Sequence, residues 1–376
     1  MQTVTLAFEK RFSEQPACLV RAPGRVNLIG VHTDYNEGFV LPMAIDRAVW
    51  IALRPRPDRC VVVHALDFGE SVEFLLDDLQ RSRGWAEYIK GMAWAMQDEG
   101  LILQGWEGVL AGDVPIDAGL SSSAATEIAV ARAFAAISGL AWAPTKMALL
   151  GQKAENEWIG LNCGIMDQMV SAAARAGHAF FLDCRSREYE HIPLPPDLAV
   201  VVLDTTTRRG LVDSVYNERR AQCEAAARFF GVKSLRDVHA DALEAKSKKL
   251  EHVVWRRARH VVTENMRVLE AVKALKAREV IRFGQLLYES HASLRDDFEV
   301  TDDALNQMVD CASQHPACYG ARMTGAGFGG CAVALVRAQA AQDFALSVMV
   351  NYQRKTGLRP GVHLCTAAEG TDVIWG

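Results

Sequence analysis

Short apolar runs alternate along this chain with longer segments in which apolar residues recur three and four positions apart. The first pattern is typical of buried strands and the second of amphipathic helices. The apolar runs predict strands over residues 49–53, 61–65, 108–112, 179–182, 199–203, 331–336 and 362–365. The helical spacing predicts helices over residues 85–97, 122–138, 145–159, 212–230, 252–275, 279–290, 303–314 and 338–355. This mixed order favours an α+β fold.

The length of 376 residues predicts two domains or lobes. Prolines at 193, 195 and 196 interrupt helix and inner strand alike, so they mark the expected boundary. We therefore predict an N-terminal lobe over residues 1–195 and a C-terminal lobe over residues 196–376. The long apolar stripe within residues 252–275 predicts core packing rather than a groove for a partner.

Composition narrows the possible functions. A net charge of −5 argues against a general nucleic-acid binder, which would carry a basic surplus, but it leaves room for small anionic ligands. The nine scattered cysteines include no CxxC pair, which is typical of reduced thiols in the cytosol. No signal-like N-terminal segment and no uncharged apolar run of about 20 residues is visible. We expect a soluble cytoplasmic protein.

A serine-rich loop at Gly119–Ala124 follows an apolar run and leads directly into a predicted helix. The first N–H groups of a helix lack partners within it, and its dipole is positive at that end, so such a loop suits phosphate. The three hydroxyls add hydrogen bonds or a Mg²⁺ ligand. The alternative is an ordinary serine-rich cap on a buried helix.

The segment Arg21–Asn36 places Arg25, His32 and Asp34 among glycines and other small residues. Glycine permits close approach of the backbone to a ligand, and these side chains supply donors and acceptors for hydroxyls and phosphate. The alternative is a turn-rich loop whose charges are satisfied internally.

Two carboxylates form a third candidate site. Glu155 lies late in a helical pattern and Asp167 follows 12 residues on; one suits Mg²⁺, and the other suits accepting a proton or orienting a hydroxyl. Apolar neighbours flank Asp167, so its charge requires a partner, for which Arg25 is the candidate. The alternative is a buried structural ion pair.

A glycine-rich loop at Arg322–Gly330 precedes an apolar strand. The loop is suited to lie over phosphate or a sugar pocket. It does not fit the dinucleotide-binding order, in which a strand precedes the glycines and a helix follows them, and the chain has no GxxxxGK[ST] P-loop.

These four segments, in this order, resemble the GHMP small-molecule kinases and, among them, the galactokinases. Residues 25–30 with 32–45 look like the galactokinase signature, and residues 163–168, 183–186, 214–220 and 291–299 match further patterns. The resemblance covers essentially the whole chain. It implies a two-lobed α+β fold with the active site in the interlobe cleft and an N-terminal lobe like ribosomal protein S5 domain 2.

The resemblance also implies residue roles for the transfer of phosphate from ATP to an anomeric hydroxyl. Asp167 would be the catalytic base and Arg25 would stabilise the phosphoryl group, while Ser123 and Glu155 would bind Mg²⁺. The implied sugar contacts are Val31, His32, Thr33, Asp34 and Tyr216. The implied nucleotide contacts are Asp117, Ala118, Gly119, Leu120, Ser121, Ser122 and Ser123, with Trp85 and Tyr88 near adenine or, alternatively, in the core. The expected cofactors are ATP and Mg²⁺, and the expected partners are the sugar and ATP, with no nucleic acid or membrane. We expect a monomer or weak dimer.

Four places depart from the family pattern: Val31, Asp117, Ala326, where glycine is common, and residues 204–208, where many relatives carry an Asn-Ser-Asn run. Val31 replaces a glutamate expected to bind the sugar 6-hydroxyl, so either galactose binds more weakly or the substrate differs at C6, as in galacturonate, a 6-deoxy sugar or arabinose. Asp117 replaces a glycine at the start of the nucleotide loop. A third possibility, a non-catalytic sugar and ATP sensor, is disfavoured because the serine loop, Asp167 and Arg25 are all present.

Overall fold

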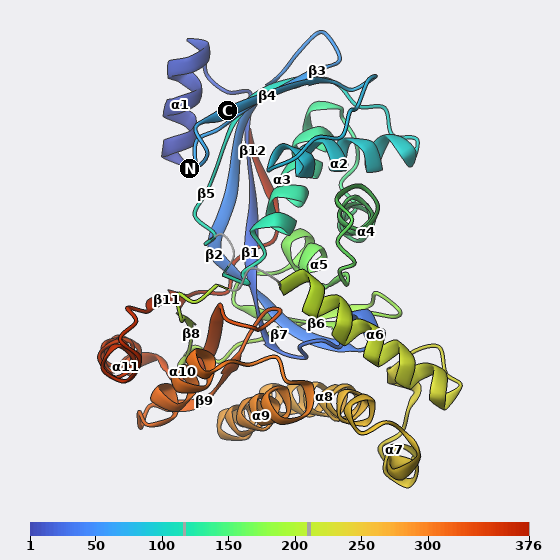
Figure 1. Cartoon of the computed structure of the whole chain (residues 1–376). Helices are drawn as coiled ribbons and strands as arrows, with labels where there is room; N and C mark the ends of the chain where they lie inside the picture. The colour runs from blue at the N-terminus through green and yellow to red at the C-terminus, as the bar shows by residue number, and fades with distance from the viewer. Residues whose placement is uncertain (116–117, 209–211, 376) are drawn as a thin grey trace.

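The computed structural model describes residues 1–115, 118–208 and 212–375. Its strands are β1 Cys18–Ile29, β2 Phe39–Pro55, β3 Cys60–Ala65, β4 Glu70–Leu75, β5 Trp106–Gly112, β6 His178–Asp183, β7 Tyr189–Pro193, β8 Leu198–Asp204, β9 Cys318–Met323, β10 Cys331–Arg337, β11 Gly361–Cys365 and β12 Asp372–Trp375. Its α-helices are α1 Gln2–Phe12, α2 Ala86–Asp98, α3 Ser122–Ile137, α4 Pro144–Lys153, α5 Met166–Ala173, α6 Val212–Phe230, α7 Ala240–Ala245, α8 His252–Lys276, α9 Val280–Ser293, α10 Asp303–Ser313 and α11 Ala341–Thr356. Figure 1 shows two bodies joined by the long strands β1 and β2.

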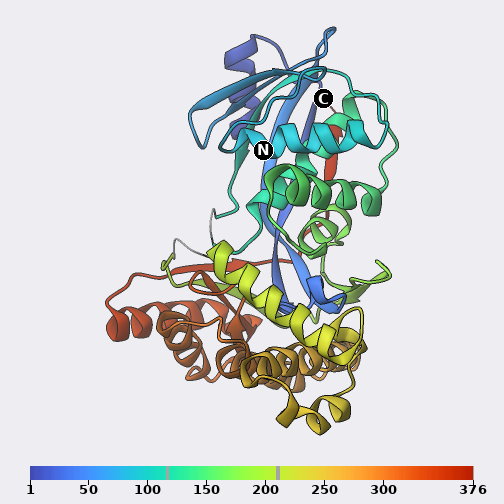
Figure 2. The same cartoon turned by 45° about the vertical axis from the view of Figure 1, so that its right-hand side comes forward.

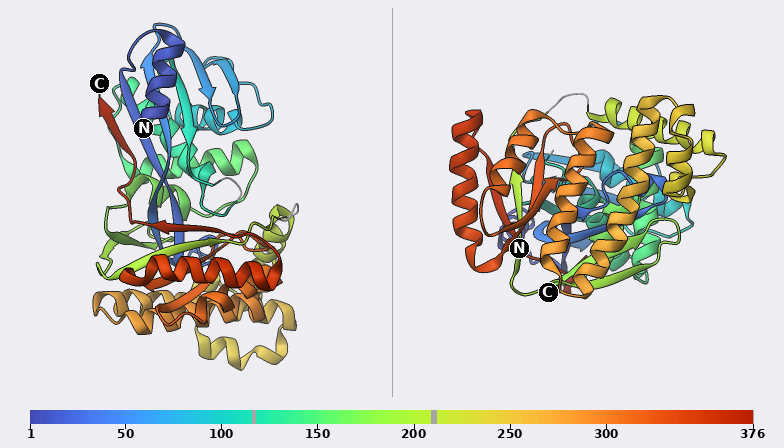
Figure 3. Two further views of the ribbon diagram at one scale, coloured as in Figure 1. Left: turned by 90° about the vertical axis from the view of Figure 1, so that its left-hand side faces the viewer. Right: turned by 90° about the horizontal axis from the view of Figure 1, so that it is seen from below.

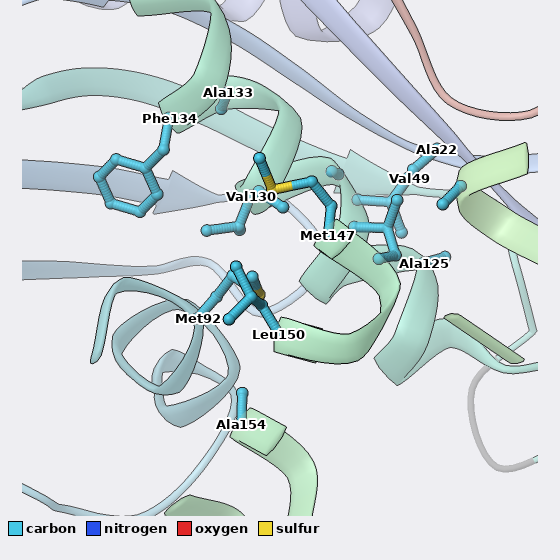
Figure 4. Close-up of a cluster of buried hydrophobic side chains, with 14 of the residues drawn as sticks. Ala22, Val49, Met92, Ala125, Val130, Ala133, Phe134, Met147, Leu150 and Ala154 are labelled. Atoms are coloured by element: carbon cyan, nitrogen blue, oxygen red, sulfur yellow. The ribbon is translucent and has the colours of Figure 1, made fainter. Parts of the chain in front are cut away.

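The upper body is built on a sheet with strand order β12-β1-β2-β5-β3-β4, in which β3 and β5 are parallel. Helices α2, α3, α4 and α5 cover one face, and their apolar side chains pack with those of the strands in a large core that includes Phe134, Met147 and Met92 (Figure 4). Helix α1 covers part of the other face through Val4 and Phe8. The sheet is therefore buried between layers, which explains the continuous apolar runs of its inner strands.

The lower body is built on an antiparallel sheet with strand order β11-β8-β10-β9. Alternate residues of a strand face opposite sides, and here both sides are covered. Val200 and Val202 pack with residues of α8 and α9, whereas Val201 and Leu203 pack with residues of α10 and α11. Seen from below, α8 and α9 lie side by side (Figure 3).

Three strands complicate a division of the chain into two consecutive halves. β6 pairs with the start of β2 and with β7, and β12 pairs with β1 in the upper sheet. Helix α6 runs across the boundary between the bodies (Figure 2). The boundary after residue 195 stays a prediction, although the last described residues lie beside the first lobe.

Every predicted strand lies within an observed one, and the predicted helices are present. Two helices differ in detail. The predicted helix over 145–159 is α4 followed by a π-helical turn, Ala154–Ile159, and the one over 338–355 begins with a 3-10 turn, Ala338–Ala340, before α11. The apolar runs and the helical spacing did not predict α1, α5, α7, β1, β4, β7, β9 or β12. Among the described residues, no helix has the length and apolar character needed to cross a membrane.

Candidate active site

A cavity of about 800 Å³ brings the four sequence segments together. Its wall includes Arg25 from β1, the serine loop Gly119–Ser123, Asp167 from α5, and Gly325 and Ala326 from the glycine-rich loop. His32 and Asp34 line it from the turn between β1 and β2. Segments far apart in the sequence therefore share one site, as the sequence predicts.

Arg25 and Asp167 form the ion pair predicted from the apolar flanks of the aspartate. Arg25 Nε donates to Asp167 Oδ1 at 2.7 Å and Arg25 Nη2 to Oδ2 at 2.5 Å, a two-pronged geometry that fixes both side chains. Arg25 Nη1 also donates to the Gly119 carbonyl at 2.6 Å, and the Ser121 hydroxyl donates to Asp167 Oδ2. One guanidinium thus joins the carboxylate to the serine loop.

The serine loop takes its shape from backbone conformations that small residues allow. Gly119 has φ 76° and Ser121 has φ 60°, both in the left-handed region that favours glycine. A Cβ on Gly325 would lie 3.1 Å from the Gly119 Cα, so the two loops touch through their backbones. Helix α3 begins at Ser122, and its positive end faces the cavity that Ser122 and Ser123 line.

Glu155 and Ser123, the predicted Mg²⁺ ligands, lie together beside the serine loop. The Ser123 hydroxyl donates to Glu155 Oε1 at 3.3 Å. Behind them, Gln168 Nε2 donates to Glu155 Oε2 at 2.7 Å and to Glu127 Oε2 at 3.0 Å. Burial raises the pKa of both glutamates, since each charge is removed from water. Glu155 occupies the π-helical turn after α4, a local irregularity that often marks functional sites.

The cavity carries more negative than positive charge. Among its described lining residues, Arg25 is the only arginine or lysine, against the carboxylates of Asp34, Asp67, Glu155 and Asp167. A nucleoside triphosphate would add further negative charge. The hard oxygens of Glu155 and Ser123 fit a divalent cation that would offset it, with phosphate oxygens and water completing the ligands.

A further part of the cavity wall is formed by His32, Asp34, Tyr216 and Val31, with the His32 and Tyr216 ring centroids 5.4 Å apart. His32 Nε2 lies 3.1 Å from the Ala326 carbonyl and its Nδ1 lies 3.0 Å from Tyr35 Oη, and burial lowers its pKa to about 3, so the ring is neutral. Nε2–H therefore donates to Ala326 and Nδ1 accepts from Tyr35. Burial, followed by the nearby charge of Asp167, raises the pKa of Asp34 to about 6. The Val31 side chain is 4% exposed and presents an apolar surface.

Comparisons with known proteins agree with this geometry. The galactokinase galactose-binding signature matches residues 6–55, and the N- and C-terminal domains of GHMP kinases match residues 87–175 and 271–351. A galactokinase of Roseiflexus sp. (strain RS-1) is 46% identical over 373 residues, which cover 98% of this chain and 95% of the relative. The chain belongs to the galactokinase family. Another galactokinase, of Chloroflexus aggregans (strain MD-66 / DSM 9485), is 44% identical over 382 residues, covering 100% and 98% of the two chains.

Two solved kinase structures share the fold of this galactokinase-family chain. A crystal structure of Lactococcus lactis galactokinase complexed with galactose superposes with a TM-score of 0.94 at 35% identity, covering 98% of both chains. A mevalonate kinase superposes with a TM-score of 0.64 at 17% identity, covering 93% of this chain and 99% of the other. The second likeness concerns the fold alone. The predicted two-lobed GHMP kinase fold is therefore confirmed.

Not all of the residues predicted to contact the sugar or the nucleotide line the cavity. Thr33 and Ala118 are fully buried and do not line the cavity; the Thr33 hydroxyl lies within hydrogen-bond distance of the carbonyls of Gly30 and Phe39. Leu120 lines the cavity but is 1% exposed. Asp117 lies outside the described residues. These contacts stay predictions.

The sequence pattern missed an aromatic residue at the end of the cavity that holds Trp85 and Tyr88. Phe68, in the turn between β3 and β4, stacks on Trp85 with ring centroids 5.7 Å apart and an interplanar angle of 6°. Both rings line the cavity, and Phe68 is 45% exposed. Its local sequence carries no signal for this role, because the contact joins the turn between β3 and β4 to the start of α2, a separate element.

Proposed function

We propose that this protein is an ATP-dependent galactokinase, which phosphorylates the anomeric hydroxyl of galactose and releases ADP and galactose 1-phosphate. The observation that carries the proposal is the paired Arg25 and Asp167 between the serine loop and the sugar end of one cavity. Full-length relatives named galactokinase and the galactose-bound lactococcal structure support the same substrate.

The geometry supports a direct transfer between two bound substrates. The sugar would lie against His32, Asp34 and Tyr216, and the triphosphate would rest on the serine loop. The anomeric oxygen forms a bond to the γ-phosphorus while the bond from that phosphorus to the β,γ-bridging oxygen breaks, and ADP leaves. Asp167 would accept the hydroxyl proton through Oδ1, which retains a lone pair beyond its bond with Arg25 Nε, whereas Oδ2 already accepts from Arg25 Nη2 and Ser121.

Arg25 would act through position and charge. Phosphoryl transfer depends mostly on alignment and on stabilising the charge of the transferred group. A guanidinium fixed to both Asp167 and the Gly119 carbonyl is held in place before substrates bind, so little reorganisation is needed. Mg²⁺ held by Ser123 and Glu155 would neutralise phosphate charge and orient the triphosphate.

The assay that tests the proposal is coupled detection of ADP with galactose, galacturonate, arabinose and N-acetylgalactosamine, each with ATP and Mg²⁺. We expect galactose to give the highest kcat/KM, because the relatives favour it over a C6 variant. Absence of turnover with every sugar would favour a non-catalytic sensor and overturn the proposal. Omitting Mg²⁺, with EDTA present, should abolish turnover.

Asp167→Ala tests the assigned base. We expect kcat to fall by about 10²–10⁴-fold, the range for loss of a general base, while ATP still raises Tm. Asp67→Asn is a matched control, because this carboxylate lines the same cavity but accepts from the Gly112 N–H away from the ion pair. A D167A variant that kept near-normal kcat would remove Asp167 from the mechanism.

We also infer that the protein acts in the cytoplasm as a monomer or weak dimer, with lobes meeting after residue 195. The nine scattered cysteines, with no CxxC pair, support the compartment. Sedimentation across a concentration series measures the oligomeric state, and a stable dimer at nanomolar concentration would contradict it.

A further inference from the structure

The turn that carries His32 and Asp34 is an irregular piece of backbone. We call residues 30–39, between β1 and β2, the sugar loop. Gly30 has φ 96°, and His32 and Glu37 have φ of 63° and 55°. A non-glycine residue in this region is costly and persists only when its surroundings hold it there. Contacts from elsewhere in the molecule must therefore hold His32 and Glu37 in this conformation.

One helix of the lower body supplies three bonds to the backbone of this loop. Glu264 Oε1 accepts from the Gly30 N–H at 3.0 Å, and Asn265 Oδ1 accepts from the Phe39 N–H at 2.8 Å. His260 Nε2 lies 3.0 Å from the Val31 carbonyl, to which it donates. His260, Glu264 and Asn265 all belong to α8, where positions four apart share a face. The bonded atoms lie at both ends of the loop, on either side of His32 and Asp34.

All three side chains are buried, and two of them, Glu264 and His260, are held by further hydrogen bonds. Glu264 is fully buried; Ser290 donates to its Oε1 and Arg267 Nε to its Oε2, each at 2.7 Å. His260 Nδ1 lies 2.9 Å from the Ser293 hydroxyl. Since α9 supplies both serines, two packed helices fix the side chains that fix the loop.

The contact of Asn265 with the sugar loop also constrains the residue at position 38. Asn265 Oδ1 lies where a Cβ on Gly38 would approach to 2.4 Å, so only glycine leaves room for it at that position. Its Nδ2 has no hydrogen-bond partner among the described residues. The side chain is therefore used through one oxygen, which pairs a backbone N–H at the end of the sugar loop.

We propose that His260, Glu264 and Asn265 are positioning residues that set the geometry in which the sugar loop presents His32 and Asp34 to the sugar. None of the three lines the cavity, so each acts through the backbone rather than on the substrate. The proposal rests on the proposed function, since it takes the sugar to lie against His32 and Asp34. It makes the affinity for sugar, but not for ATP, depend on a helix of the other lobe.

The primary test is Asn265→Ala, measured as separate KM values for galactose and ATP and as calorimetric galactose binding. Loss of a buried backbone bond worth ~1.4 kcal/mol predicts an about tenfold higher KM for galactose. The KM for ATP should change less than twofold. Asn265→Asp keeps an accepting oxygen and replaces the unpartnered NH₂ with a second oxygen. Burial favours the protonated carboxyl, whose carbonyl oxygen still accepts from the Phe39 N–H, so this variant should restore galactose KM to within about threefold of the parent.

Two further variants make the result decisive. Thr263→Val, on the same helix, loses a hydroxyl whose bonds among the described residues are to carbonyls of α8, so both KM values should stay unchanged. If N265A does not fold, His260→Phe, which removes the donor to the Val31 carbonyl, must raise galactose KM selectively. Equal changes in both KM values, or none, would overturn the proposal.

Asp34→Asn separates this inference from the function on which it rests. If D34N leaves galactose binding unchanged, the proposed sugar site is wrong. If D34N weakens galactose binding while N265A and H260F do not, the site stands and the role of α8 is refuted.

Discussion

Asp34 is the residue whose environment predicts the clearest pH dependence. Burial and the charge of Asp167 raise its pKa to about 6, above its ordinary value of 3.8. A sugar hydroxyl needs the charged carboxylate as acceptor, so galactose affinity should rise as pH increases from 5 to 7. We expect an about tenfold gain across that interval for the parent and a flat profile for Asp34→Asn, measured by calorimetry without ATP.

The raised pKa of Asp34 also affects stability, but in the opposite direction: as pH increases, galactose affinity should rise whereas this contribution to stability is lost. Because the folded-state pKa is raised, the native protein holds this proton more tightly than the unfolded chain does. The favourable contribution is present below pH 4 and is lost as pH rises through 6. D34N should therefore unfold at a higher temperature than the parent at pH 7 while binding galactose less well. A parent profile flat from pH 5 to 7 would contradict the assigned pKa.

Val31 sets the chemistry of one wall at the sugar end. Its apolar side chain cannot accept a hydrogen bond, and its position lines the cavity near Asp34. Val31→Glu adds an acceptor for a hydroxyl and a charge that repels a C6 carboxylate, so the ratio of kcat/KM for galactose over galacturonate should rise about tenfold or more. Val31→Leu is the control for size. An unchanged ratio in V31E would show that position 31 does not set the preference between galactose and galacturonate.

At the scale of elements, the β3–β4 hairpin supplies an aromatic wall to the cavity. Phe68 lies at its turn and stacks on Trp85, which Glu70 fixes by accepting from Trp85 Nε1 at 2.9 Å. Phe68→Ala should raise the KM for ATP about fivefold, since a stacked aromatic contact is worth roughly 1 kcal/mol, and leave galactose KM unchanged. Leu75→Ala, an exposed position on the same hairpin, is the control. A selective change in galactose KM would reverse the assignment of the two ends.

The sequence predicted those elements whose local pattern of apolar and polar residues reflects how they are buried. Inner strands such as β8 and β10 read as apolar runs because both faces are covered, and the apolar flanks of Asp167 correctly required a charged partner. β1 did not read as a strand, because its residues from Ala22 to Ile29 are buried without alternation and include the polar Arg25 and Asn27, which line the cavity. The contact of Phe68 with Trp85 joins a hairpin turn to the start of α2, and no local pattern contains such a tertiary contact.

Helix α8 illustrates the same limit within one element. Its predicted core stripe is largely buried, as expected, but Met266 is 57% exposed and Leu269 is 38% exposed. The buried face instead includes His260, Glu264 and Asn265, polar residues that a hydrophobic count assigns to solvent. Their partners are backbone atoms more than 200 residues earlier in the chain. Long-range pairing, and not composition, decides where these side chains lie.

At the scale of the whole molecule, the chain returns to its first lobe before it ends. Ser171 and Ala174, at the end of α5, accept from the N–H groups of Thr371 and Gly370 at 2.8 and 2.9 Å. β12 then pairs with β1 from Cys18 to Arg21. The segment that precedes β12 thus braces the helix that carries Asp167, whereas β12 itself covers the far end of β1.

The pairing of β12 with β1 can therefore be removed without breaking the bonds that brace α5, the helix that carries Asp167. Ending the chain at Thr371 removes the β12 pairing but keeps the bonds to α5, so kcat and both KM values at 25 °C should stay within about twofold of the parent. The free energy of unfolding should fall by about 1–3 kcal/mol, the range for a few backbone hydrogen bonds, with a Tm lower by roughly 2–6 °C. Ile374→Ala, at a 43% exposed position, is the control and should melt like the parent. Because Arg25 lies beyond the paired residues of β1, a large loss of kcat in the shortened chain would show that the outer strand also holds the Arg25–Asp167 pair in register.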